Sequence, residues 1–269
     1  MARLAFLPMA ALPELRVAKA AFWSALATEL VRAGVQDVPT ELTVSEDLHG
    51  TWQHPNLLFS QTCGYPLVLG LDEHVQLVAT PVYTAQGCVG ANYSSAVVVR
   101  DGDTATSLED LRGRRCAFNS VDSQSGYNVL RLAVARIAQA DTFFSEVVET
   151  GGHLASLTAV VQGRADVAAI DCVGFASMRK YRPELTQRVR VLFFTDSAPG
   201  LPFITSRSTS PVELVLMRKA LGTVFKSHSL ETTRTTLLLK NVEVVSRDTY
   251  TLLTEMETEA VALGYPRLA

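Results

Sequence analysis

The sequence predicts an α/β fold with two lobes, and three observations lead to this prediction. Short apolar runs alternate with amphipathic stretches of helical period through most of the chain. The length of 269 residues corresponds to about two domains. The composition shifts twice, since residues 84–95 are rich in Gly, Ser and Tyr and residues 195–202 are rich in Ser, Pro and Gly. We expect the chain to cross between the lobes at these two segments.

The elements before the first crossing follow from the apolar pattern. Residues 4–9 form an apolar run that predicts a strand. Residues 14–33 carry apolar side chains at helical spacing, and Gly34 ends this helix. The remaining predicted elements are strands at 41–44, 57–59 and 75–82 and a helix at 65–71.

The region between the crossings continues the alternation. After a strand at 96–100, Ser107 and Asp110 have the spacing of a capping box, and Gly113 ends the short helix. Further strands are expected at 116–119, before Asp171 and at 190–194, and helices follow Gly126 and His153. Helices near 212–226 and 250–263 are expected to return to the first lobe. The predicted lobes are therefore residues 1–83 plus 200–269, and residues 84–199 inserted between them, joined by a hinge around a cleft.

Composition and charge exclude several classes of protein. Lys and Arg number 24 against 27 Asp and Glu, so the net charge of −3 lacks the basic footprint of a nucleic-acid binder. No apolar stretch reaches the roughly 18 residues that a membrane span needs, so we expect no membrane insertion. The run after Arg3 stops at Pro8 and lacks the features of a signal peptide. We expect a monomer that is cytoplasmic as written, or periplasmic if a leader precedes Met1.

The cysteines and histidines indicate neither a metal centre nor a catalytic group. The four cysteines lie far apart without a CxxC pair, and we expect buried free thiols. The five histidines show no HxxxH or HExxH spacing. Cys63 lies beside Gly64, but no neighbouring residue identifies a base that would activate it. Nucleotide and hydrolase motifs of the GxGxxG, GxxxxGK[ST] and GxSxG types are absent, so we expect no catalytic residue, no metal and no cofactor.

The segment NSVDSQSGYN at residues 119–128 predicts an anion-binding site. It connects a strand to a helix, where free backbone N–H groups and the helix dipole favour negative charge. The hydroxyls of Ser123 and Ser125 add donors, and Gly126 allows a ligand to approach the backbone closely. Simple N-capping is the alternative, but it needs only one of the serines.

Two further residues are candidates in the same lobe. His153, in the sequence TGGH, falls in the first turn of a helix, where it either donates to the anion or serves as a cap or surface residue. Asp171 ends a strand, where it either accepts from an amine or hydroxyl of a ligand or serves as a turn aspartate.

The first lobe and the first crossing supply the remaining candidates. Gln61, Thr62 and Tyr65 lie in or next to the loop SQTCGYP between a strand and a helix, and could project into the cleft. Tyr93, at the first crossing, could line the cleft or pack in a core.

Three stretches in this order resemble the phosphate/phosphite/phosphonate-type solute-binding proteins of ABC transporters: SLEDLRGRR, AFNSVDSQSGYNVL and TGGHLASLTAVVQGRADVAAID. The resemblance is strongest from Tyr93 to Asp171. It implies a type II periplasmic-binding-protein-like fold in which Ser123, Gln124, Ser125 and His153 hold the anion. Gly126 and Tyr127 belong to the same segment and join the expected ligand-binding residues. Tyr93 then lines the cleft, and Asp171 reads the substituent of the ligand.

The function implied by this resemblance is binding of a small phosphorus oxyanion (a phosphonate, phosphite or phosphate) as the substrate-binding component of an ABC transporter, with a permease as partner. An enzyme on the same fold, similar to those of menaquinone or thiamin-pyrimidine synthesis, and a cytoplasmic ligand sensor are the alternatives. Fold alone does not separate these functions. We favour anion binding without turnover, because the sequence shows no catalytic constellation.

Overall fold

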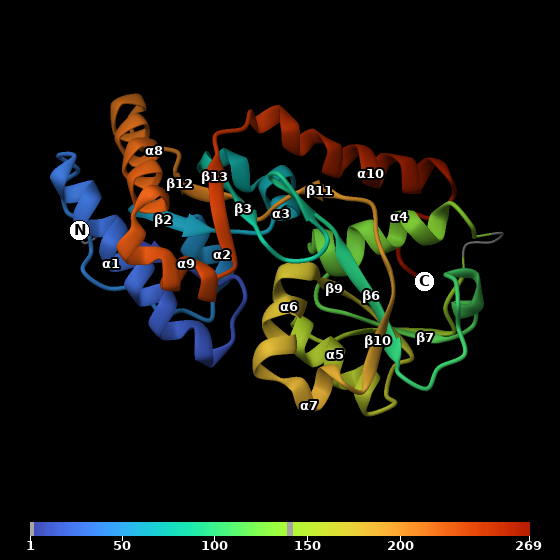
Figure 1. The fold of residues 1–269 in the computed structure, drawn as a ribbon. Coiled ribbons are helices and arrows are strands. Elements are labelled where there is room, and N and C mark those ends of the chain that lie inside the picture. Colours follow the sequence, from blue (N-terminus) through green and yellow to red (C-terminus); the bar gives the residue numbers. More distant parts are fainter. Residues whose placement is uncertain (1–2, 139–141) are drawn as a thin grey trace. The chain divides into compact units, whose positions relative to one another are not determined.

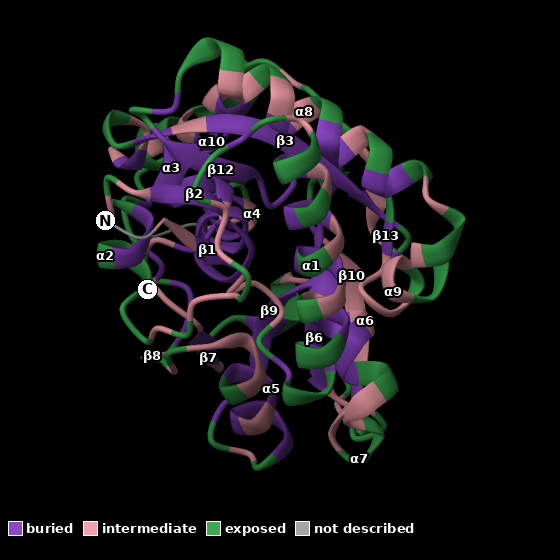
Figure 2. Ribbon diagram, turned by 90° about the vertical axis from the view of Figure 1, so that its left-hand side faces the viewer, coloured by how far each residue is buried: buried purple, intermediate pink, exposed green. Residues whose placement is uncertain are grey.

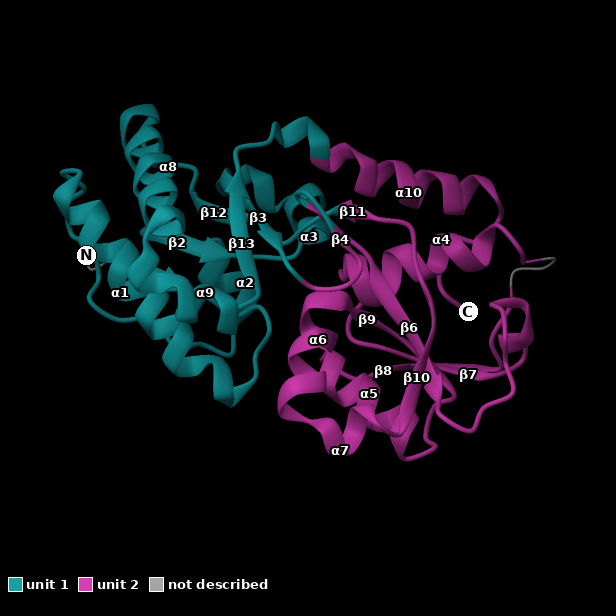
Figure 3. Cartoon of the chain, in the orientation of Figure 1, with its two compact units in different colours: residues 1–84, 89–91, 199–249 teal, residues 85–88, 92–198, 250–269 magenta. Residues whose placement is uncertain are grey.

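The computed structural model describes residues 3–138 and 142–269, which divide into two compact units. Unit 1 contains residues 1–84, 89–91 and 199–249, and unit 2 contains residues 85–88, 92–198 and 250–269 (Figure 3). The segments in which the chain changes unit hold three short strands, β4 (Cys88–Val89), β5 (Asn92–Tyr93) and β11 (Ala198–Pro199), in the order β11-β5-β4. Each unit is a mixed α/β structure, as the apolar pattern predicts.

Unit 1 is built on a five-stranded sheet of order β1-β2-β12-β3-β13. β1 and β2 are parallel, whereas β12 runs antiparallel to β2 and β3, and β13 runs antiparallel to β3. The strands are β1 (Leu4–Phe6), β2 (Leu57–Gln61), β3 (Val75–Tyr83), β12 (Phe203–Ser206) and β13 (Leu239–Glu243). The α-helices are α1 (Arg16–Arg32), α2 (Leu48–Trp52), α3 (Gly64–Val68), α8 (Pro211–Lys226) and α9 (Glu231–Thr236).

An aromatic cluster joins the helices of unit 1 to its sheet. The ring of Phe22 on α1 stacks on Phe203 of β12 at 6.2 Å, and Phe203 lies 5.0 Å from Phe59 of β2. Phe225 of α8 meets Phe22 edge to face at 5.9 Å. These side chains are buried and contribute apolar area that stabilises the unit. The strands β2 and β12 are buried along their whole length (Figure 2).

Two predicted elements of unit 1 differ from the structure. Residues 41–44 form no strand, although Thr43 N donates to Ala5 O at 2.6 Å beside β1. This segment has the apolar composition of a strand but makes too few backbone bonds with its neighbour to form one. The helix expected at 65–71 ends at Val68, because Gly70 takes a left-handed conformation with φ of 109°.

Unit 2 is built on a second five-stranded sheet, of order β10-β6-β9-β7-β8. β7 is parallel to both β8 and β9, whereas β6 is antiparallel to β9 and β10. The strands are β6 (Ser95–Arg100), β7 (Arg115–Phe118), β8 (Glu146–Glu149), β9 (Val167–Asp171) and β10 (Val189–Phe194). The α-helices are α4 (Val129–Ala135), α5 (His153–Val161), α6 (Cys172–Tyr181), α7 (Pro183–Thr186) and α10 (Thr251–Ala262) (Figure 1).

The C-terminal helix corrects one expectation. Residues 250–269 were assigned to the first lobe, but they pack within unit 2. Asn128 Nδ2 donates to Leu253 O of α10 at 2.9 Å, and Leu268 N donates to Tyr127 OH at 3.1 Å. Helical period reports that a helix has a buried face but not which unit buries it, so the sequence could not assign this helix.

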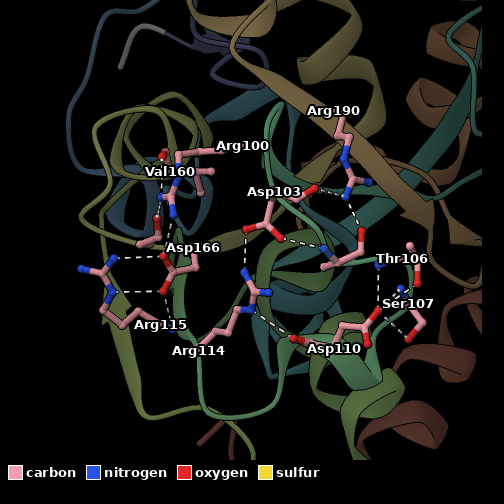
Figure 4. A network of polar contacts seen from close by, with 12 residues as sticks. Arg100, Asp103, Thr106, Ser107, Asp110, Arg114, Arg115, Val160, Asp166 and Arg190 are labelled. Carbon is pink, nitrogen blue, oxygen red and sulfur yellow. Dashed lines mark hydrogen bonds and ion pairs between the residues drawn. The ribbon is translucent and has the colours of Figure 1, made fainter.

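Charged residues fix the edge of the unit 2 sheet at which β7 and β9 begin (Figure 4). Asp166, directly before β9, accepts from Arg115 Nε at 3.0 Å and Arg115 Nη2 at 2.9 Å, and from Arg100 Nη2 at 3.1 Å. These hydrogen bonds hold the pKa of Asp166 well below its usual range. Asp110 accepts from the backbone and hydroxyls of Thr106 and Ser107, which lowers its pKa and forms half of the predicted capping box.

No helix in the described part of the chain combines the length and apolar character needed to cross a membrane.

Candidate ligand-binding site

The opposite edge of the unit 2 sheet carries most of the predicted site residues. Because β7 and β9 are parallel, Asn119 after β7 and Asp171 at the end of β9 lie at the same edge. The segment after β8 joins them, since Gly151 N donates to Asn119 O at 2.9 Å. The carboxyl ends of parallel strands are where open α/β sheets bind ligands. His153 and the segment beginning at Ser123 follow directly from these strand ends.

The two serines of the predicted anion segment have different roles. Ser123 caps the helical run, because its hydroxyl accepts from Gly126 N at 3.0 Å. Ser125 lies in the first turn, a π-helical turn at Gln124–Asn128 that continues into α4, and its Oγ is 3.0 Å from His153 Nε2. Capping therefore accounts for Ser123 alone. The hydroxyl of Ser125 is paired with the imidazole instead.

Asn119 joins this group and was not among the predicted site residues. Its Oδ1 is buried and has no hydrogen-bond partner among the described residues. A Cβ atom added at Gly126 would overlap Asn119 Oδ1 and would lie 3.3 Å from His153 Cε1. In this structure Asn119 and His153 lie close to Gly126, and the approach of a ligand that the sequence predicts there stays a prediction. The position of Asn119, at the end of a strand and four residues before the capping serine, was the signal that could have identified it.

His153 is the first residue of α5, as predicted, and its imidazole is uncharged at neutral pH. Its Nδ1 is buried. Burial lowers the pKa of His153 to about 4, and a backbone hydrogen bond with Ala169 opposes this shift. A neutral imidazole carries one donor and one acceptor nitrogen. His153 can therefore form hydrogen bonds with a ligand but contributes no positive charge in the unliganded protein.

The side chains of Gln124 and Tyr127 hold the segment against the C-terminal residues. Gln124 Nε2 donates to Met256 Sδ at 3.2 Å, and its Oε1 accepts from Asn128 Nδ2 at 2.8 Å. The Tyr127 hydroxyl accepts from Leu268 N, and its ring lies 5.1 Å from that of Phe118. In this structure both side chains are buried in packing contacts, so the contacts expected of them with an anion rest on the resemblance alone.

Asp171 combines a structural contact with an unusual protonation equilibrium. Its Oδ1 accepts from Val173 N at 2.8 Å and so caps α6, as expected of a turn aspartate. Its side chain is buried, and burial raises the pKa of Asp171 to about 6. A buried carboxyl that titrates near neutrality is characteristic of functional sites.

The other predicted residues are buried as well, in two different units. Tyr93 lies in unit 2, whereas Gln61, Thr62 and Tyr65 lie in unit 1. Gln61 Nε2 donates to Tyr83 OH at 2.7 Å and to Leu201 O at 3.1 Å, which ties the end of β2 to its own unit. Thr62 Oγ1 is buried without a hydrogen-bond partner in the described residues, which is unusual for a buried hydroxyl.

The thiols correct one expectation and agree with another. Cys116 and Cys172 are buried, as predicted, but Cys63 and Cys88 are partly exposed. Burial raises the pKa of the Cys116 thiol, which is therefore unreactive. Within residues 3–138 and 142–269, no three His, Cys, Asp or Glu residues cluster in a way that could hold a metal.

Several solved structures share this fold. A binding protein component of an ABC phosphonate transporter from Pseudomonas aeruginosa superimposes with a TM-score of 0.79 at 14% identity, covering 98% of this chain and 88% of that one. PhnD1 from Prochlorococcus marinus in complex with methylphosphonate gives 0.71 at 13% identity, covering 90% and 93%. XAC2383 from Xanthomonas citri bound to ATP gives 0.71 at 15% identity, covering 98% of both chains. The fold is that of the periplasmic binding proteins, as predicted.

The family follows from the sequence itself. Residues 14–250 match the family described as ABC transporter, phosphonate, periplasmic substrate-binding protein. The chain belongs to this family, and the resemblance found in its motifs is confirmed. No match was found among the curated proteins. Members of the family are solute-binding proteins of transporters that work with a permease, and they are not enzymes.

Proposed function

We propose that this protein binds a small phosphorus oxyanion (a phosphonate, phosphite or phosphate) as the substrate-binding component of an ABC transporter. The observation that carries the proposal is the convergence of Ser125, Asn119 and His153 around Gly126 at the carboxyl edge of the unit 2 sheet. Membership of the phosphonate-binding family and the methylphosphonate in PhnD1 support this ligand class.

The chemistry of the group suits an oxyanion. A hydroxyl, a primary amide and an imidazole can together donate several hydrogen bonds to phosphoryl oxygens. The backbone N–H groups at the start of the helical run favour the same charge. Since His153 is neutral before binding, the ligand would raise its pKa. Thr62, Tyr65 and Gln61 of unit 1 and Tyr93 of unit 2 are further proposed ligand contacts.

Asp171 would set the preference for the substituent of the ligand. Its carboxyl lies at the same edge of the sheet and is ionised for the most part at pH 7, since its pKa is about 6. A carboxylate there would favour an ammonium or hydroxyl group on an organic phosphonate. We therefore expect aminoalkyl phosphonates to bind more tightly than inorganic phosphate.

The direct test is calorimetric titration with phosphate, phosphite, sulfate, methylphosphonate, an aminoalkyl phosphonate and ATP. ATP is included because XAC2383 was solved with it bound. Ser125→Ala should weaken binding of a phosphorus oxyanion by about 5- to 150-fold, which corresponds to a loss of about 1–3 kcal/mol. Ser177→Ala is the matched control, because that buried hydroxyl donates within α6 to Val173 O at 3.0 Å. Equal affinities for Ser125→Ala and wild type would contradict the site.

Further experiments test whether the protein turns its ligand over, where it is located and what it binds. After incubation with the tightest ligand, ³¹P NMR should show the ligand unchanged; turnover would instead support an enzyme on this fold. We further propose that the protein acts in the periplasm as a monomer and delivers its ligand to a permease. Fractionation of the native host would test the location, and co-purification with a permease would test the partner.

A further inference from the structure

Two cysteines that are far apart in the sequence lie together in unit 2. Cys88, the first residue of β4, and Cys172, the first residue of α6, are 84 positions apart along the chain. Their Sγ atoms are 3.4 Å apart. A disulfide needs a separation of about 2.0 Å, so the two sulfurs have to approach by about 1.4 Å, within reach of small side-chain rotations.

The backbone around the pair holds the two residues in place. Ser94 N donates to Gly87 O at 2.9 Å, and Cys172 N donates to Ser94 O at 3.2 Å. These bonds join the segment before Cys88 to the start of α6. Gly87 has φ of 98°, and a Cβ atom there would lie 3.1 Å from Cys172 Cβ, so the chain passes close beside Cys172. The proximity of the thiols therefore results from fixed backbone contacts.

The two thiols differ in access and in acidity. Cys88 is partly exposed, whereas Cys172 is buried. The contact with Cys88, burial and the nearby Asp171 carboxyl all raise the pKa of the Cys172 thiol. An oxidant therefore meets Cys88 first, and Cys172 is placed to react second.

We propose that Cys88 and Cys172 are a modification site that forms an intramolecular disulfide with a disulfide-bearing oxidant, such as glutathione disulfide or a thiol–disulfide oxidoreductase. The thiolate of Cys88 attacks the oxidant, forms a mixed disulfide and releases one thiolate of the oxidant. The thiolate of Cys172 then attacks the Cys88 sulfur, forms the Cys88–Cys172 bond and releases the second thiolate. Two thiols are oxidised, one disulfide is reduced to two thiols, and the two protons pass to solvent or to the released thiolates.

The disulfide would constrain the end of β9, next to the candidate ligand-binding residues, although neither cysteine is one of those residues. Cys172 directly follows Asp171, and the bond would tie residue 88 to the end of β9. Closing a long loop constrains the unfolded chain, so the melting temperature should rise by several degrees. Proteins outside the cytoplasm meet oxidants of this class. Formation of the disulfide requires no bound anion, so this inference goes beyond the proposed function.

The experiment uses the full chain with Cys63 and Cys116 replaced by Ala, so that Cys88 and Cys172 are the remaining thiols. After incubation of the folded protein in glutathione disulfide, we expect a mass loss of two hydrogens, no free thiol, and a tryptic peptide that joins Cys88 to Cys172. Dithiothreitol should restore both thiols and remove the gain in melting temperature. Adding Cys172→Ser should leave a stable glutathione adduct on Cys88. Stable glutathione adducts, or two persistent free thiols, in the protein that retains both cysteines would overturn the proposal.

A second measurement protects the test from a folding defect in the Cys63 and Cys116 variant. Peptide mapping of the wild-type chain after the same oxidation should give the Cys88–Cys172 peptide and leave Cys63 and Cys116 alkylated. A cross-link between any other pair would equally overturn the proposal. Neither result depends on anion binding, so a failure here leaves the proposed function standing.

Discussion

Replacing Asp171 by Asn should stabilise the folded protein at pH 7, because the native structure buries this carboxylate with little compensation. Burial raises the pKa of Asp171 from 3.8 to about 6. The folded state thus binds the proton more tightly than the unfolded state, and stability falls as pH rises from about 4 to about 6. The shift of about 2 pKa units corresponds to a penalty of about 3 kcal/mol at pH 7.

Asparagine removes this penalty without removing the helix cap. Its amide oxygen can still accept from Val173 N, as Asp171 Oδ1 does at 2.8 Å. We expect a gain of about 2–3 kcal/mol at pH 7, a gain that shrinks towards zero near pH 4, where the wild-type carboxyl is protonated. For a chain of this size, the melting temperature at pH 7 should rise by about 4–10 °C.

Differential scanning calorimetry at pH 4, 5, 6 and 7 is the appropriate assay. Both tryptophans, Trp23 and Trp52, lie in unit 1, so tryptophan fluorescence would follow the wrong unit. Asp166→Asn is the matched control at the other end of β9. Arg115 and Arg100 hold the pKa of Asp166 below its usual range, so this change should destabilise the protein at pH 7. An Asp171→Asn protein no more stable than wild type at pH 7, with an unchanged pH slope, would refute the reasoning.

Three further predictions concern the anion site. The His153 imidazole should titrate near pH 4 by NMR instead of near 6.5. Because its folded pKa is lowered, its contribution to stability is present above pH 6.5 and is lost as pH falls through 4. An unshifted titration would contradict the burial of the imidazole. Gly126→Ala should weaken oxyanion binding by at least about tenfold in calorimetry, because the new Cβ meets Asn119. The circular dichroism spectrum should stay unchanged. Unchanged affinity would mean that Asn119 does not shape the site. Asn119→Asp should likewise weaken oxyanion binding by about tenfold or more through charge repulsion. Asn241→Asp, at an exposed position of β13, should leave the affinity unchanged. Equal effects of the two substitutions would indicate a general effect of charge.

The sequence predicted the elements of the fold well, because each was set by local pattern. The helix at 14–33 was predicted from apolar spacing and is α1 with a 3₁₀ turn before it. The strand expected before Asp171 is β9, which is buried along its whole length. The strand expected at 41–44 failed because strand formation needs a partner with matching backbone bonds, which local composition does not report.

The residues of the candidate site differ in how far local pattern could indicate them. Ser125 and His153 were predicted from sequence motifs at the starts of two helices, where free backbone N–H groups favour an anion. The structure brings the two side chains together. Asn119 was missed because its role depends on contact with Gly126, which is a tertiary feature. The Cys88 and Cys172 contact was missed because 84 positions separate the two residues and no local spacing signals it. Long-range contacts of this kind are fixed by sheet order, which periodicity does not determine.

The two ends of β9 carry aspartates whose pKa shifts have opposite effects on stability at neutral pH. Asp166, at its start, is paired with two arginines and its lowered pKa stabilises the fold at neutral pH. Asp171, at its end, is buried and accepts hydrogen bonds from the backbone N–H groups of Val173 and Gly174, and its raised pKa costs stability at the same pH. A protein selected for stability alone would gain from asparagine at position 171, since the cap would remain. The carboxylate of Asp171 lies at the edge where Ser125 and His153 also lie, and under the proposed function a ligand would recover the lost energy through its own positive or hydroxyl group.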